Sequence, residues 1–134
     1  MTEIFADTFY FLALVNPEDA AHTPARSASR NLPGKIVTTV WVLTEVGNTL
    51  SRRVHRPRFR ALWRMLRGDP DVLILPASQR LFDRGLLLYL ARRDKEWLVT
   101  DCISFLVMKE RGIRDALTGD RHFEQAGFRA LLKG

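Results

Sequence analysis

Short apolar runs alternate along the chain with longer stretches in which apolar residues recur at helical spacing. The short runs are β-branched or continuously apolar, and Pro, Gly or Asp follows most of them, as is typical of strands. Val72–Leu75 is apolar at every position, which predicts a strand buried on both faces. This pattern predicts five strands, near Ile4–Ala6, Ile36–Thr39, Val72–Leu75, Asp115–Thr118 and Phe128–Leu131.

The longer stretches predict helices between these strands. In the clearest one, Phe59, Leu62, Trp63 and Leu66 stand at positions i, i+3, i+4 and i+7, and arginines occupy another face. In the helix expected from Ser78 to Arg92, the stretch Leu81–Leu90 is apolar on more than one face. This fits either a central buried helix or a subunit interface. Helices are expected from about Thr8, from Pro17 to Asn31, from Val40 to Arg53, from Phe59 to Arg67, from Ser78 to Arg92, from Thr100 to Gly112, and briefly after Asp120.

The order of these elements predicts the fold class. Strands that are separated by helices form a parallel sheet with helices on both faces. We therefore expect an α/β protein with three layers, α/β/α, and a parallel sheet of about five strands. A length of 134 residues predicts a single domain over residues 1–134. The carboxyl ends of all the strands would meet at one edge of the sheet, where open α/β folds bind their ligands.

Composition excludes several classes of protein. Hydrophobic residues make up 46% of the chain, as in ordinary globular proteins, and no apolar run is long enough to span a membrane. The apolar stretch Phe9–Val15 follows Glu3 and Asp7 without a basic segment, so we do not expect a signal peptide. Cys102 is the only cysteine, which excludes an internal disulfide and fits a reducing compartment. We expect a cytoplasmic protein in which Cys102 is a packing residue.

The net charge of +6 comes from one window. Between Arg52 and Arg67 there are seven arginines and no acid, whereas the rest of the chain carries 14 basic and 15 acidic residues. Three interpretations are open: contact with RNA phosphates, contact with an acidic partner peptide, or a solvated helix face. The seven arginines are Arg52, Arg53, Arg56, Arg58, Arg60, Arg64 and Arg67.

Four acids are expected at the carboxyl edge of the sheet. Asp7 and Asp120 follow strands, Asp101 begins a helix, and Glu45 stands one turn inside a helix with apolar neighbours. Carboxylates that converge repel one another unless they share divalent cations, and Mg²⁺ and Mn²⁺ prefer such oxygen ligands. Each Asp also fits a helix N-cap, so spacing alone leaves both interpretations open. Asn48 shares the face of Glu45 and is expected either to support it, to touch substrate, or to be exposed.

The local motifs carry more information than the spacing. Thr100–Phe105 and Ala116–Phe128 resemble the C-terminal half of PIN-domain nucleases, and most closely the VapC-type toxins of bacterial toxin–antitoxin pairs. Phe5–Thr8 and Thr44–Asn48 match in the expected places, so the resemblance covers essentially the whole chain. The resemblance implies an endoribonuclease that uses Mg²⁺ or Mn²⁺. It implies an acidic quartet formed by Asp7, Glu45, Asp101 and Asp120.

The resemblance also assigns supporting positions and partners. Thr8 and Thr118 stand where the family often has a supporting hydroxyl, and His122 stands where many relatives carry another acid. We expect Asp7 and Asp101 to be the main metal ligands, and His122 to be a surface or hydrogen-bonded residue. The expected partners are an RNA substrate, a cognate antitoxin protein and a second copy of the chain.

Other functions remain to be distinguished. A PIN nuclease of RNA processing would lack the toxin role, and a catalytically silent RNA-binding module would bind without cleaving. A phospho-acceptor signalling domain also gathers aspartates at strand ends, but it needs a second acid near the first strand and a lysine after the last. Asp7 has no acidic neighbour and the only late lysine is Lys133, which argues against that class.

Overall fold

The five expected strands form one sheet. The computed structural model describes residues 2–133. In these residues the sheet order is β3-β2-β1-β4-β5, and every pair of neighbouring strands is parallel. The elements are β1 Glu3–Ala6, α1 Thr8–Val15, α2 His22–Arg30, β2 Lys35–Thr39, α3 Val40–Thr49, α4 Arg56–Gly68, β3 Val72–Leu75, α5 Gln79–Ala91, α6 Val99–Arg111, β4 Asp115–Leu117, α7 Arg121–Gln125 and β5 Arg129–Ala130.

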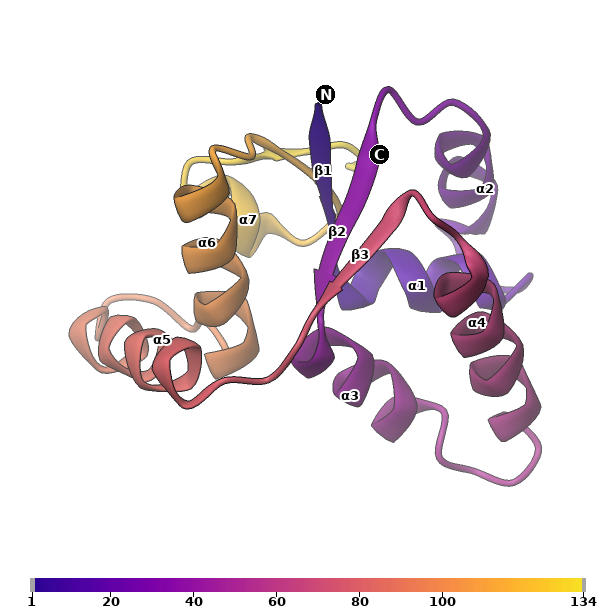
Figure 1. Ribbon diagram of the computed structural model, residues 1–134, viewed down its shortest axis with the longest axis horizontal. Helices are drawn as coiled ribbons and strands as arrows, with labels where there is room; N and C mark the ends of the chain where they lie inside the picture. Colours follow the sequence, from indigo (N-terminus) through magenta and orange to yellow (C-terminus); the bar gives the residue numbers. More distant parts are fainter. Residues whose placement is uncertain (1, 134) are drawn as a thin grey trace.

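Helices cover both faces of this sheet, as Figure 1 shows. Helices α1, α2 and α4 lie on one side of the strands, and α5, α6 and α7 lie on the other. Helix α3 continues directly from the carboxyl end of β2 and packs against α1. The expected three-layer α/β/α fold with a parallel sheet is therefore confirmed.

The position of β3 corrects one detail of the sequence-based prediction. A strand buried on both faces was expected at Val72–Leu75, but β3 pairs only with β2 and stands at the edge of the sheet. Leu73 is 39% exposed as a result. The central strand is β1, in which Ile4, Phe5 and Ala6 are fully buried.

Three helix boundaries also differ from the prediction, and one of them is the start of α4, at Arg56 rather than Phe59. Helix α2 begins at His22 rather than Pro17, because the side chains of Asn16 and Asp19 accept the backbone N–H groups of Glu18 and Ala21 and hold this segment in turns. Helix α3 ends at Thr49 rather than Arg53. In the intervening segment, the Arg52 carbonyl accepts the N–H groups of His55 and Arg56, a turn that leads into α4.

Helix α5 packs on α6 along one face only. A Cβ atom at Gly85 would overlap Cγ1 of Ile103, so the two helices approach closely there. The opposite face of α5 leaves Leu87 68% exposed and Leu90 60% exposed. Of the two interpretations of this apolar helix, the central buried helix is therefore wrong.

Aromatic residues pack α7 into the core next to α6. The rings of Phe105 and Phe123 meet edge to face, with centroids 4.9 Å apart, and Trp97 packs against Phe105 in the same way at 5.0 Å. The short helix α7 is thus anchored by the fully buried Phe123. Within residues 2–133, no helix combines the length and apolarity required to cross a bilayer.

Candidate active site

Parallel pairing of β1 with β4 brings the two ends of the chain's sequence together at the carboxyl edge of the sheet. Ala6 and Leu117 are paired residues, so the next residue of each strand, Asp7 and Thr118, are neighbours. The Thr118 hydroxyl donates to Oδ2 of Asp7 at 2.9 Å. Both residues are buried, and Asp7 is only 4% exposed. The Thr118 hydroxyl therefore holds one carboxylate oxygen of Asp7.

The loop after β4 packs closely against α1. A Cβ atom at Gly119 would lie 2.5 Å from Cζ of Phe9, so only glycine fits there without movement of the ring. The next residue, Asp120, donates its backbone N–H to the Thr118 hydroxyl at 3.0 Å and caps α7 by accepting the His122 N–H at 2.8 Å. Thr118 therefore links the loop to Asp7 and fixes where Asp120 lies.

Asp101 joins the same edge from the first turn of α6. Its Oδ2 accepts the backbone N–H of Leu98 at 3.0 Å, which satisfies the helix start, and it also meets Nδ1 of His122 at 2.9 Å. Asp101 is 4% exposed. The N-cap interpretation of this residue is wrong, because the N-cap of α6 is Leu98 and Asp101 is the third residue of the helix. The bond to the Leu98 N–H does not exclude a ligand role, because both hydrogen bonds fall on one carboxylate oxygen.

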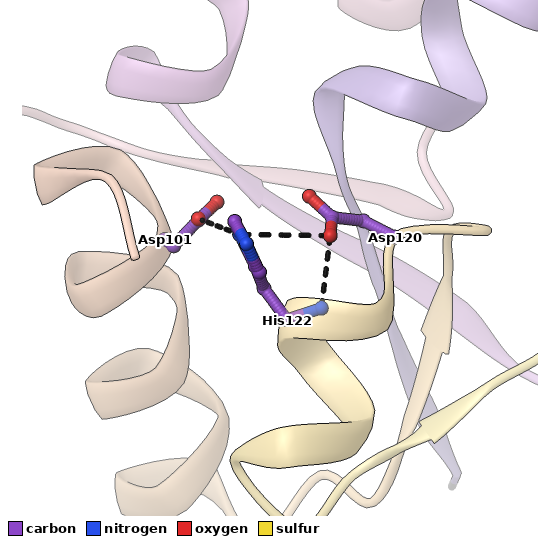
Figure 2. A group of neighbouring side chains, drawn as sticks. All are labelled: Asp101, Asp120 and His122. Carbon is purple, nitrogen blue, oxygen red and sulfur yellow. Dashed lines mark hydrogen bonds and ion pairs between the residues drawn. The ribbon is translucent and has the colours of Figure 1, made fainter. Parts of the chain in front are cut away.

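The imidazole of His122 lies between two of the acids. Figure 2 shows the ring pointing from the start of α7 toward the carboxylates of Asp101 and Asp120, and its Nδ1 is 3.6 Å from Oδ1 of Asp120. Ligand atoms of these three residues all lie within 4.8 Å of one another. The sequence placed His122 at the surface or in a hydrogen bond. The hydrogen bond is present, and it is made to a residue of the acidic quartet.

Glu45 is linked to the site by a hydrogen bond from the Thr8 hydroxyl. The Thr8 hydroxyl donates to Oε1 of Glu45 at 2.5 Å, and Thr8 directly follows Asp7. Glu45 is half-buried, but it is not part of the group formed by Asp101, Asp120 and His122. Asn48 is exposed and lines a shallow groove with Phe59 and Trp63. Among residues 2–133 its side chain makes no hydrogen bond to Glu45, and its contact with substrate stays a prediction.

Burial and mutual repulsion raise the pKa values of two of the acids, Asp7 and Asp101. Burial, together with the charges of Asp101 and Asp120, raises the pKa of Asp7 to about 7, although the Thr118 hydrogen bond opposes this. Burial also raises the pKa of Asp101, against the hydrogen bonds from Leu98 and His122. A cation bound between these carboxylates would stabilise their ionised forms, which burial and mutual repulsion disfavour. The donor set of carboxylate oxygens and one imidazole nitrogen therefore fits a divalent metal ion.

Two neighbours of Asp101 on α6, Cys102 and Ser104, are fully buried. Burial, with a further contribution from Asp101, raises the pKa of the Cys102 thiol to about 11, so Cys102 is a packing residue as expected. Ser104 was not singled out from the sequence. Its hydroxyl is buried and has no hydrogen-bond partner among residues 2–133, and its i+3 spacing from Asp101 was the only available signal.

The arginines of the basic window lie in the turn after α3 and along α4. Arg52 and Arg53 stand in the turn between the two helices, and the other five stand on α4. Over residues 2–133, none of the seven forms an ion pair with an acidic side chain. Arg67 instead stacks on Trp63, 5.6 Å from its ring centroid, and Trp63 remains 38% exposed. The positive charge of this window is available to an anionic partner.

Comparison with known proteins adds to this geometry. The model of the PIN domain matches residues 4–129. The 23S rRNA-specific endonuclease VapC20 of two Mycobacterium tuberculosis strains is 31% identical over 126 residues, which cover 93% of this chain and 95% of that protein. The crystal structure of M. tuberculosis VapC20, described as a sarcin-ricin loop cleaving toxin, matches with a TM-score of 0.86 at 29% identity, covering 93% and 95% of the two chains. The structure of FitAcB from Neisseria gonorrhoeae shares the fold, with a TM-score of 0.64 at 17% identity over 95% of each chain.

Proposed function

The chain belongs to the PIN-domain family, and on that premise we propose that it is a metal-dependent endoribonuclease, the toxin of a toxin–antitoxin pair. One observation carries the proposal: Asp7, Asp101 and Asp120 interact at the carboxyl edge of the sheet, and burial raises the pKa of Asp7 to about 7. Its relative VapC20 cleaves 23S rRNA by name, so RNA phosphodiesters are the proposed substrate class. We propose that residues 1–134 act as one nuclease domain in the cytoplasm.

The site residues have separate roles in this proposal. Asp7 and Asp101 would be the main ligands of Mg²⁺ or Mn²⁺, and Asp120 and Glu45 would complete the site or position water. The bound cation would lower the pKa of a coordinated water and neutralise charge on the phosphate. Thr118 orients Asp7 through its hydroxyl, and Thr8 orients Glu45 in the same way. The chain therefore supplies fixed ligands and their supports.

The proposal is tested by RNA cleavage under metal control. We expect the purified protein to cut RNA in bacterial ribosomes, including 23S rRNA, at discrete positions that primer extension maps. Cleavage should stop with excess EDTA and return when Mg²⁺ or Mn²⁺ is restored. Binding of RNA without any cleavage would favour the silent RNA-binding module, and cleavage that resists EDTA would contradict a metal-dependent mechanism. Cleavage without growth arrest on induction would favour an RNA-processing nuclease.

The basic window is the proposed binding surface for RNA, with the antitoxin as the competing partner. The double substitution Arg60→Glu and Arg64→Glu is expected to weaken binding of single-stranded RNA and to lower the slope of log affinity against log salt by about 1.4, since each lost phosphate contact on a single strand contributes about 0.7. Binding is measured by fluorescence anisotropy in an Asp101→Asn background, which prevents cleavage.

The matched control replaces Arg26 and Arg30 on α2 with Glu, which changes the net charge equally at exposed positions outside the window. Equal weakening by both pairs would reject a specific surface. Unchanged RNA affinity together with lost binding of the antitoxin would assign the window to the protein partner instead.

The exposed face of α5 is the proposed homodimer interface. Leu87 and Leu90 are largely exposed there, and Phe82 and Tyr89 are partly exposed. Several large apolar side chains exposed on a helix that is already packed on its other side mark an interaction surface. A second copy of the chain is the proposed occupant.

A further inference from the structure

His122 presents a nitrogen atom to the same space as two carboxylates of the site. Nδ1 of its imidazole lies 2.9 Å from Oδ2 of Asp101 and 3.6 Å from Oδ1 of Asp120. In Figure 2 the ring lies between the two acids, which come from α6 and from the loop before α7. A cation that lies between these carboxylates would therefore meet the imidazole as its third protein donor.

The imidazole is held in this position by the fold. Its side chain is 19% exposed, and the backbone N–H of His122 is fixed on Oδ1 of Asp120 at 2.8 Å. The next residue, Phe123, is fully buried and packs edge to face on Phe105 of α6, the helix that carries Asp101. His122 and Asp101 are thus positioned by one packed unit, as a preformed ligand pair requires.

A nitrogen donor changes which cation the site prefers. Mg²⁺ favours oxygen ligands and near-ideal octahedral geometry, whereas imidazole suits transition-metal ions. We propose that His122, with Asp101 and Asp120, forms a mixed nitrogen and oxygen site that selects Mn²⁺ over Mg²⁺. This inference rests on the proposed function, because it assumes that the acidic edge holds a divalent cation.

A competing role for His122 is that of a positioning residue. In that case Nδ1–H would donate to Asp101 and orient its carboxylate, and no nitrogen would bind the metal. The two roles differ in the identity of the atoms next to the ion. A spectroscopic measurement on bound Mn²⁺ therefore separates them without reference to activity.

The test uses the full chain loaded with one equivalent of Mn²⁺. We expect the electron spin echo envelope modulation spectrum of bound Mn²⁺ to contain signals from a directly bound imidazole nitrogen. These signals should change when the wild-type protein is made with ¹⁵N-labelled histidine. His122→Asp replaces the nitrogen with an oxygen donor and should abolish the nitrogen modulation. It should also lower the ratio of Mn²⁺ to Mg²⁺ affinity, measured by calorimetric competition, by about tenfold or more.

Arg121→Ala is the matched control, since it changes an exposed neighbour on α7 and should keep both the modulation and the affinity ratio. His122→Asn, with circular dichroism to confirm the fold, repeats the test if His122→Asp does not fold. Bound Mn²⁺ without nitrogen modulation, or an unchanged affinity ratio in His122→Asp, would overturn the inference. The proposed function would stand in that event if RNA cleavage still depends on a divalent cation, and it would fail only if cleavage itself is absent or resists EDTA.

Discussion

Asp7→Asn and Asp101→Asn are each expected to reduce RNA cleavage by at least about 10²–10³-fold while the protein remains folded. Asn has the shape of Asp but carries no charge, so it is a much poorer ligand for a divalent cation. Its carbonyl oxygen can still accept the hydrogen bonds that these positions make, from the Thr118 hydroxyl at position 7 and from the Leu98 N–H at position 101. Loss of activity would therefore not follow from loss of the fold.

The cleavage rate is measured on one mapped site in 23S rRNA with saturating Mn²⁺ or Mg²⁺. Asp83→Asn provides the matched control, because Asp83 is exposed on α5, bonds only to the Gln79 side chain among residues 2–133, and lies outside the proposed site. It should cleave RNA like the wild type. Wild-type activity in either Asp7→Asn or Asp101→Asn would remove that residue from the metal centre.

The same Asp7→Asn substitution is expected to stabilise the metal-free protein at neutral and higher pH. The pKa of Asp7 is raised from 3.8 to about 7 in the folded protein, so the folded state retains a proton that the unfolded state has lost. The contribution of Asp7 to the free energy of unfolding is therefore fully present below pH 3.8 and is lost as the pH rises to about 7. The wild type should lose about 4 kcal/mol of unfolding free energy from this residue over that range.

Asn is neutral at every pH, so Asp7→Asn should escape this loss. The two proteins should have similar unfolding free energies near pH 4, and the variant should be more stable by about 4 kcal/mol at pH 8. Urea denaturation in EDTA measures both curves, and Asp83→Asn again serves as the control, with a curve parallel to that of the wild type. A difference between Asp7→Asn and the wild type that does not vary with pH would show that Asp7 is not buried as an ionisable group.

Together, these two results would separate function from structure at one position. A variant that gains stability and loses activity identifies a residue whose charge is retained for chemistry at a cost to the fold. A variant that loses both would point to a structural role for Asp7.

The sequence contained enough information to predict the fold because its elements follow strong local rules. Alternation of apolar runs with amphipathic stretches determines a parallel sheet, and that topology alone brings Asp7 beside Thr118 although 111 positions separate them. The edge position of β3 could not be predicted in this way, because a fully apolar run of four residues does not reveal how many strands flank it. The early end of α3 was missed for a similar reason, since the Arg52–Arg56 turn is made by backbone groups.

The candidate site was predicted in part. The positions of Asp101 and Asp120 follow from their places at the starts of α6 and α7. The contact between His122 and Asp101 depends on how α7 packs against α6 through Phe123 and Phe105, and no spacing in the sequence encodes that packing. Sequence motifs thus identify which acids meet, whereas tertiary packing decides which neighbour lies between them.

The hydrogen bond from Thr118 to Asp7 has a consequence for the synthesis of the protein. Asp7 is translated before its partner, which lies after β4, and both Thr118 and Asp120 follow most of the sheet and helices in the order of translation. The acidic edge therefore cannot assemble while the ribosome is still making the first four-fifths of this sequence. The order of synthesis therefore places completion of the acidic edge after most of the fold has been made.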